Sequence, residues 1–162
     1  MIALLRTIAT VLALWLAVAA TARAQEHSPV IDFSNGDPEM AAAQEKARAA
    51  LPTFWKAFEH PGPGEEGFAL KVAVPVGGNN TEHIWMVDIQ RQGGKITGVA
   101  GNVPRDATRM RPGERVEIQE DHISDWMFMR AGKIVGNETM RPALKRIPAK
   151  EAARLRQMLE EP

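Results

Sequence analysis

The stretch His60-Pro61-Gly62-Pro63-Gly64 constrains the fold more than any other feature, because it separates two kinds of sequence. Two prolines and two glycines in five residues end a helix, since proline lacks a backbone N–H and glycine leaves the backbone unrestricted. Residues 37–59 are rich in alanine and other helix formers, whereas residues 65–135 alternate between apolar and polar positions. We therefore expect helices before this break and a sheet after it.

The segment before the break predicts two helices. Asp37 can cap the first helix, and Pro38 and Glu39 suit its first turn. The helix-prone run 40–50 is interrupted at Pro52. After that interruption, apolar residues recur at the spacing of one helix face, which predicts packing on the sheet: Leu51, Phe54, Trp55 and Phe58. For Trp55 we prefer core packing over a role as a ligand platform.

The segment after the break predicts five or six short antiparallel strands. Glycine-containing turns separate alternating runs at 68–76, 82–90, 95–100, 115–119, 126–130 and 133–135. At Ala131-Gly132 we expect a three-residue loop with Gly132 in the left-handed conformation. On the strand 126–130 both faces are apolar, so either it is central and covered on both sides or one face meets a partner or the first helix.

A last helical pattern begins at Pro148, with one apolar side over 149–160. The fold class is therefore α+β. We expect N-terminal helices packed on a bent antiparallel sheet, or on a small partly open barrel of five to six strands, and a C-terminal helix at 148–162. Residues 37–147 would form a single α+β domain.

The N-terminus has the pattern of a secretory signal peptide. Arg6 precedes an apolar run from 8 to 20, which closes with the small-x-small sequence Ala22-Arg23-Ala24. We expect cleavage after Ala24, a flexible leader at 25–36, a periplasmic or secreted location and no integral membrane segment after cleavage. A retained membrane anchor is the alternative, because one arginine is a short basic region.

Composition excludes several functional classes. The signal segment contains two of the 20 Lys and Arg residues, so a mature chain would have about two more acidic than basic residues. That balance gives no electrostatic basis for binding nucleic acid. The chain has no cysteine, which excludes disulfides, thiol chemistry and zinc–thiolate sites. We expect no cofactor and no metal site.

The stretch Asp121-His122-Ile123-Ser124-Asp125-Trp126 has two interpretations. Adjacent residues on a turn do not converge as a catalytic triad does, which argues against a nucleophilic serine. We prefer a turn capped by the Asp121 carboxylate, with Ile123, Trp126 and Phe128 in the core. Asp125 would then bond a backbone N–H or pair with Arg141 or His83.

The strand 82–90 supplies the other candidate residues. Its more apolar alternate positions are His83, Trp85, Val87 and Ile89, and we expect this face, including Trp85, to lie in the core. His83 would lie at the core edge, either as a hydrogen-bonded structural residue or as part of a polar mouth. No two histidines have the i,i+2 or i,i+4 spacing of metal ligands.

Several short motifs stand out along the chain: Glu82-His83-Ile84-Trp85, Gly98 to Pro104, Pro112 to Val116, Ile123 to Met127, and the series Gly132, Gly136, Thr139 and Arg141. Together these motifs resemble the YegJ-like family, the domain of unknown function 2314. The resemblance covers about residues 40 to 142. It implies a small bacterial domain, often exported, and it supplies no catalytic residues.

These observations favour an exported, non-catalytic accessory or binding module. Its ligand would be an unknown envelope protein or glycan, bound at a sheet mouth near His83, Asn102, Asp125 and Arg141. The alternative is a small hydrolase or metal-dependent enzyme with His83 and Asp125 as its acid–base pair. An enzyme requires these two side chains within hydrogen-bond reach in a concave pocket, whereas a module has them bonded to backbone.

Overall fold

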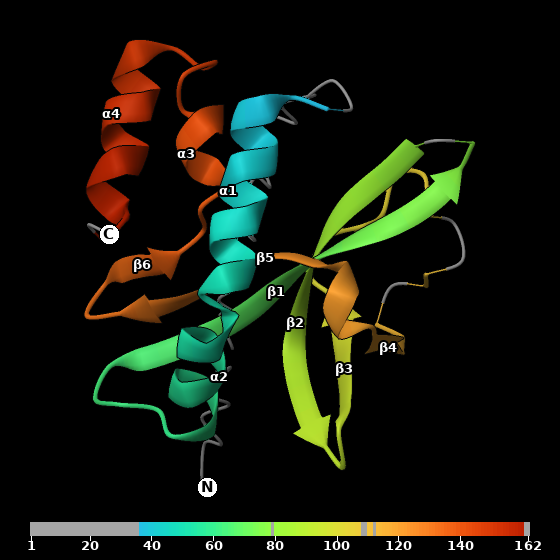
Figure 1. The fold of residues 1–162 in the computed structure, drawn as a ribbon. Helices are drawn as coiled ribbons and strands as arrows, with labels where there is room; N and C mark the ends of the chain where they lie inside the picture. The colour runs from blue at the N-terminus through green and yellow to red at the C-terminus, as the bar shows by residue number, and fades with distance from the viewer. Residues whose placement is uncertain (1–35, 79, 108–109, 112, 161–162) are drawn as a thin grey trace, which may run out of the picture. The chain divides into compact units, whose positions relative to one another are not determined.

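The computed structural model describes residues 36–78, 80–107, 110–111 and 113–160. The predicted signal peptide and residues 25–35 of the predicted leader lie outside them. The described residues form four α-helices, one short 3₁₀ helix and a six-stranded antiparallel sheet, which confirms the α+β class (Figure 1). None of the described helices has the length and apolar character needed to cross a membrane.

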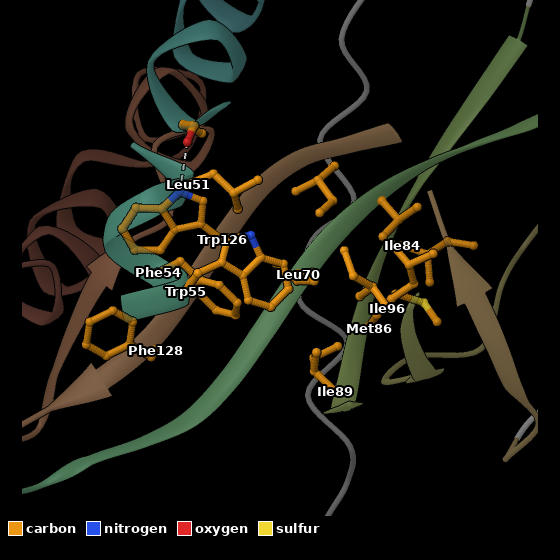
Figure 2. Packing of buried hydrophobic residues seen from close by; sticks show 14 of the residues in the cluster. Leu51, Phe54, Trp55, Leu70, Ile84, Met86, Ile89, Ile96, Trp126 and Phe128 are labelled. Atoms are coloured by element: carbon orange, nitrogen blue, oxygen red, sulfur yellow. Dashed lines mark hydrogen bonds between the residues drawn. The ribbon is translucent and has the colours of Figure 1, made fainter. Parts of the chain in front are cut away.

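Two consecutive helices lie on one face of the sheet. In α1 (Pro38–Ala49) the Asp37 carboxylate caps the first turn by accepting the N–H groups of Glu39 and Met40, at 3.1 and 3.0 Å. α2 (Leu51–Glu59) has the expected apolar stripe, in which Leu51, Phe54 and Trp55 are buried and Phe58 is partly buried. Figure 2 shows Leu51, Phe54 and Trp55 of this stripe beside Trp126, whose indole N–H donates to the carbonyl of Ala47 at 2.8 Å.

The strands follow the order β4-β3-β2-β1-β5-β6 in an open sheet. Their bounds are β1 (Glu65–Gly77), β2 (Asn80–Gln92), β3 (Lys95–Ala100), β4 (Arg115–Ile118), β5 (Ile123–Arg130) and β6 (Lys133–Gly136). The first four strands are neighbours in chain order, and η1 (Glu120–His122) then leads from β4 to β5 on the other side of β1. β1 is therefore central, paired with β2 on one side and β5 on the other.

The predicted core face of β2 is wrong for most of the strand. Ile84 and Met86 are fully buried, whereas His83 is exposed, Trp85 is half-buried and Val87 is 39% exposed. Trp85 therefore lies outside the hydrophobic core to which the sequence assigned it.

An irregularity in β2 explains the difference. The pairing of β2 with β3 shifts between Val87 and Gln90, and Asp88 between them has a positive φ of 49°. Such a bulge inserts one residue and reverses the alternation beyond it. Ile89 consequently shares the buried side with Ile84 and Met86, although its sequence position matches Trp85.

Strand β5 is covered on both sides. On one face Trp126 and Phe128 join the α1–α2 core, and on the other Met127 and Met129 pack against a second cluster formed around Ile134, Leu144 and Leu159. That cluster includes residues beside α3 (Met140–Ala143) and on α4 (Ala149–Met158). The two-sided apolar pattern of this strand therefore reflects a central position between two layers.

The β5–β6 connection also differs from the expectation. Arg130 pairs directly with Lys133, so the loop contains two residues, and both have positive φ: Ala131 at 49° and Gly132 at 79°. This is the primed two-residue turn, which matches the twist of the flanking strands. Alanine rarely adopts this conformation, so the sequence favoured the longer loop.

Candidate functional site

Asp125 is the centre of a buried network that joins β5 to the segment before α3. Its fully buried carboxylate accepts the N–H groups of Trp126, Glu138 and Thr139 at 2.8, 3.2 and 2.8 Å. It also accepts the Thr139 hydroxyl at 2.6 Å. These four bonds use the acceptor capacity of the carboxylate, so Asp125 fixes the chain segment 138–139 against β5.

Lys71 connects this network to the sheet surface. It stands on β1 in register with Asp125 of β5 and Trp85 of β2. Its ammonium donates to the Thr139 hydroxyl at 2.6 Å and lies 4.7 Å from the centroid of the Trp85 ring. The half-buried Lys71 thus carries its charge beside a tryptophan ring, an arrangement stabilised by cation–π attraction.

Burial and the neighbouring opposite charge shift the pKa values of Asp125 and Lys71 in opposite directions. Burial raises the pKa of Asp125, while the hydrogen bonds from Thr139 and Trp126 and the positive charge of Lys71 act in the opposite direction. Burial also lowers the pKa of Lys71, and the negative charge of Asp125 opposes that change. Each group therefore favours the ionised form of the other.

His83 pairs with Ser124, not with Asp125. The register of β1 with β5 shifts between Lys71 and Val72, and Ser124 is the extra residue of this bulge. The His83 Nδ1 atom lies 2.9 Å from the Ser124 hydroxyl, which itself donates to the carbonyl of Lys71 at 3.2 Å. Because serine has one proton, we assign the N–H to Nδ1 of His83, which leaves Nε2 as an acceptor in the neutral ring.

This geometry opposes a catalytic serine. Ser124 is only 2% exposed, and its proton is donated to backbone and not to an imidazole base. Partial desolvation by its neighbours lowers the pKa of His83, and the charge of Lys71 acts in the same direction. His83 is thus a neutral hydrogen-bonding group at neutral pH.

The other two predicted site residues, Arg141 and Asn102, lie in different parts of the fold. The Arg141 Nε atom lies 3.2 Å from a carboxylate oxygen of Glu138, and its Nη2 donates to the carbonyl of Glu160 at 3.1 Å. Arg141 therefore ties α3 to the segment after α4. Asn102 is exposed and follows Gly101, whose N–H donates to the carbonyl of Trp85 at 2.7 Å. This contact places Asn102 close to the β2 backbone.

Within the described ranges, the structure joins Asp125 and Arg141 to the same segment, 138–139, and gives no hydrogen bond or ion pair between His83 and Asp125. No group of three His, Asp or Glu side chains that could hold a metal ion occurs in the described part of the chain.

The Asp121 cap is also absent from the described hydrogen bonds. The turn is the 3₁₀ helix η1, which begins after Gln119 without a side-chain cap, and Asp121 is exposed. Ile123 and Trp126, expected as core anchors beside it, are buried at 1% and 4% exposure.

Glu82 was not expected as a site residue, although its side chain fixes a loop 23 residues further along the chain. Its carboxylate accepts the N–H groups of Arg105, Asp106 and Ala107 at 2.7, 2.9 and 2.8 Å. Burial acts to raise the pKa of Glu82, but these three donors and the charge of Arg105 outweigh it and hold the pKa below its usual value. No local pattern signals such a contact.

The hydrogen bonds that connect Lys71 with Ser124 and Thr139 were also not expected. A signal for Lys71 existed, since it is the only charged residue in the alternating run 68–76. A lysine within a strand of a half-buried sheet needs a partner, but the sequence could not say which.

Comparison with known proteins matches the chain to a bacterial family. A family model described as an uncharacterized protein conserved in bacteria, domain of unknown function 2314, matches residues 37–159, and this bears out the resemblance. The chain is 38% identical over 92 residues to "Uncharacterized protein YegJ" of Escherichia coli K12, covering 57% of this chain and 60% of that protein. It is 34% identical over 121 residues to "Putative ankyrin repeat protein NMB1133/NMB1171" of Neisseria meningitidis serogroup B, covering 70% of this chain and 47% of that protein. The chain thus spans about half to three-fifths of these relatives, and no solved structure matches it.

Proposed function

We propose that this chain, which belongs to the bacterial family domain of unknown function 2314, is an exported binding module without catalytic activity. The position of Trp85 is the main support for this proposal. It is a half-buried tryptophan that lies outside the core, and the ammonium of Lys71 lies 4.7 Å from its ring centroid. An indole that is left partly in solvent beside a positioned cation is typical of a recognition surface.

The surface consists of Trp85, Lys71 and His83, with exposed Val87 next along β2, and we call it the Trp85 surface. A hydrogen bond holds each polar side chain of this surface in place: Lys71 bonds to Thr139, and His83 bonds to Ser124. Side chains that are fixed before binding lose little conformational entropy when a ligand arrives. This favours binding over a purely structural role for the three residues.

The groups of the Trp85 surface define the ligand chemistry. The indole and Val87 offer apolar area, the Lys71 ammonium offers positive charge, and the neutral His83 ring offers an acceptor. A ligand with an apolar or planar part beside an anionic group fits this set. An envelope protein or an acidic glycan has both features.

The bonds of Asp125 and Ser124 support binding over acid–base catalysis. Both side chains are almost fully buried, and their hydrogen bonds go to groups that position the chain. A general base must reach the substrate proton directly or through one water. In the proposed module these residues serve as supports for the Trp85 surface.

Affinity capture from a bacterial envelope extract tests the proposal. The immobilised full-length chain should retain a ligand that Trp85→Ala and His83→Ala chains lose, while Gln90→Ala, an exposed change on the same strand, retains it. Circular dichroism must show that all three variants keep the fold. Equal recovery by wild type and Trp85→Ala would overturn the assignment of this surface.

Export has a separate test. Expression of the chain in a bacterium, fractionation and mass spectrometry of the N-terminus should give a periplasmic or secreted product that begins at Gln25. A product in the cytoplasm with residues 1–24 retained would overturn the export part of the proposal and leave the Trp85 surface unaffected.

A further inference from the structure

We propose that the edge strand β4 accepts an extended peptide segment with basic residues as an additional strand of the sheet. This site is distinct from the Trp85 surface and does not depend on the function proposed for it. Three features of the molecule support this site: the contrast between the two sheet edges, an apolar cavity beside β4, and the charge around β4.

The two edges of the sheet differ. Beyond β6, the segment after α4 covers the outer edge, since Leu159 forms a bridge with Ile134 and the Glu160 N–H donates to the Ile134 carbonyl at 2.8 Å. β4 pairs with β3 alone, and no strand in the described part of the chain lies on its other side. An edge strand presents a row of unpaired N–H and C=O groups, which can pair with another chain.

A cavity of about 210 Å³ borders this edge. Its walls are mainly apolar and come from three strands and the loop before β4: Val72, Val74, Met86, Met110, Val116 and Ile118. Residues 116–118 of β4 and the following Gln119 all line it, although neighbouring side chains of a strand point to opposite faces. The cavity therefore meets the backbone edge of β4 as well as one of its faces.

The opposite wall of the cavity is a second strand edge. β1 pairs with β5 only as far as Val72, so residues 73–75 have β2 as their single partner strand in the described ranges. Pro75 lies in this stretch, and a proline within a sheet belongs at an edge position where no N–H is needed. Pro75 thus blocks pairing with β1, and we assign the incoming strand to β4.

The volume and its lining indicate what part of the peptide enters. A single water needs about 10–15 Å³ of cavity volume, so 210 Å³ admits a side chain. In a paired strand alternate residues point to the same side, so a peptide bonded to β4 would direct an apolar residue into the cavity and its neighbours outward. Main-chain bonds and one filled pocket are the usual basis of strand addition.

Charge favours basic residues at the outward positions. Glu114, Glu117, Glu120 and Asp121 are exposed around the edge, and the described ion pairs include none of them. Arg115, the cation within β4, already pairs with Asp88, and exposed Arg111 in the loop before β4 is outnumbered by these four acids. The same acids disfavour pairing of two β4 edges, because like charges would stand opposite one another.

The experiment uses the acetylated and amidated heptapeptide Lys-Val-Lys-Val-Lys-Val-Lys and the full-length chain. Binding is measured by titration, and hydrogen exchange with mass spectrometry follows the amides of residues 115–118. We expect saturable binding that weakens with salt, together with slower exchange in β4. The double variant Glu117→Lys, Glu120→Lys should bind at least about tenfold more weakly.

Two matched controls exclude a general charge effect. The double variant Glu45→Lys, Glu151→Lys makes the same change in net charge at exposed positions of α1 and α4 and should bind as wild type. The peptide with proline in place of its central valine should not bind, because it cannot complete the pairing.

Absence of binding at 1 mM peptide, or binding without slower exchange in β4, would overturn the proposal. So would equal loss in both double variants. Sedimentation of the chain without peptide is a further test. If the chain is a dimer and its β4 amides are already protected from exchange, a second copy of the chain occupies β4 and the proposal is wrong.

Discussion

Replacement of Gly136 by alanine should destabilise the protein more than an ordinary glycine change. Gly136 ends β6 with a φ of 79°, and a Cβ there would lie 2.5 Å from the carbonyl oxygen of Trp126 and 2.6 Å from two atoms of its indole. The Trp126 carbonyl cannot move freely, because it accepts the N–H of Asn137 at 2.8 Å. The indole is also fixed by its bond to Ala47.

Two costs contribute to the expected change. A non-glycine residue in the left-handed region costs about 1–2 kcal/mol, and forcing a methyl group into a packed site costs about 1–3 kcal/mol. Gly136→Ala should therefore lower the free energy of unfolding by about 2–5 kcal/mol. That is a large part of the stability of a domain of this size.

Gly132→Ala is the matched control. Gly132 also has a φ of 79°, but a Cβ there would meet nothing within 4 Å. It should cost only the backbone term, about 1–2 kcal/mol. Urea unfolding of both variants, compared at equal m values, isolates the contact with Trp126. Equal free energies of unfolding for the two variants, within about 0.5 kcal/mol, would refute the close approach of Gly136 to the indole.

Three further outcomes are expected. Trp126→Ala should cost about 3–5 kcal/mol in urea unfolding through the cavity it leaves, and an unchanged melt would contradict its core position. Asp125→Asn should cost about 3–5 kcal/mol, because it removes a buried charge and places an amide among N–H donors, whereas the exposed control Asp121→Asn should stay within about 0.5 kcal/mol. The lowered pKa of Glu82 contributes stability that is present above its ordinary pKa of 4.5 and lost as pH falls through the folded value. Acid unfolding should therefore be less steep in Glu82→Gln, and identical pH profiles would argue against the three-donor contact.

The order and type of the elements could be predicted because their signals are local. The Asp37 cap, the stripe of α2 and the glycine-separated alternation each depend on residues within one turn or one strand. α3 was not expected, since it contains only four residues and one of them is Pro142. A single turn of helix has too few residues to show a period.

The faces of β2 could not be predicted, because one backbone irregularity decided them. Up to Val87 the alternation is regular, and Asp88 then shifts it by one residue. The apolar count favoured the face with Trp85, which has more large apolar residues but the wrong phase. An aspartate with positive φ is tolerated, but nothing in the sequence marks it as a bulge.

The partners of the charged residues could not be predicted for a different reason. Glu82 bonds to residues 23 to 25 positions away, and Asp125 to residues 13 and 14 positions away. The sequence predicted Arg141 or His83 as the partner of Asp125. Both residue types can pair with a carboxylate, but Arg141 pairs with Glu138 and His83 bonds to Ser124. Only the fold brings the backbone donors to the carboxylate, and such contacts have no sequence spacing of their own.

The segment from Ile123 to Met127 connects the two layers between which it lies. Trp126 points to one side and bonds to α1, while Asp125 points to the other and bonds to the segment before α3. Thr139, which Asp125 fixes, in turn accepts the Lys71 ammonium beside Trp85. Loss of the Asp125 carboxylate should therefore release Lys71 from Thr139 and change the environment of the Trp85 ring. In a Trp15→Phe, Trp55→Phe, Trp126→Phe background Trp85 is the one tryptophan left, and its fluorescence should then shift in Asp125→Asn before global unfolding begins. An unchanged Trp85 spectrum in the folded variant would show that the Asp125 network does not support the Trp85 surface.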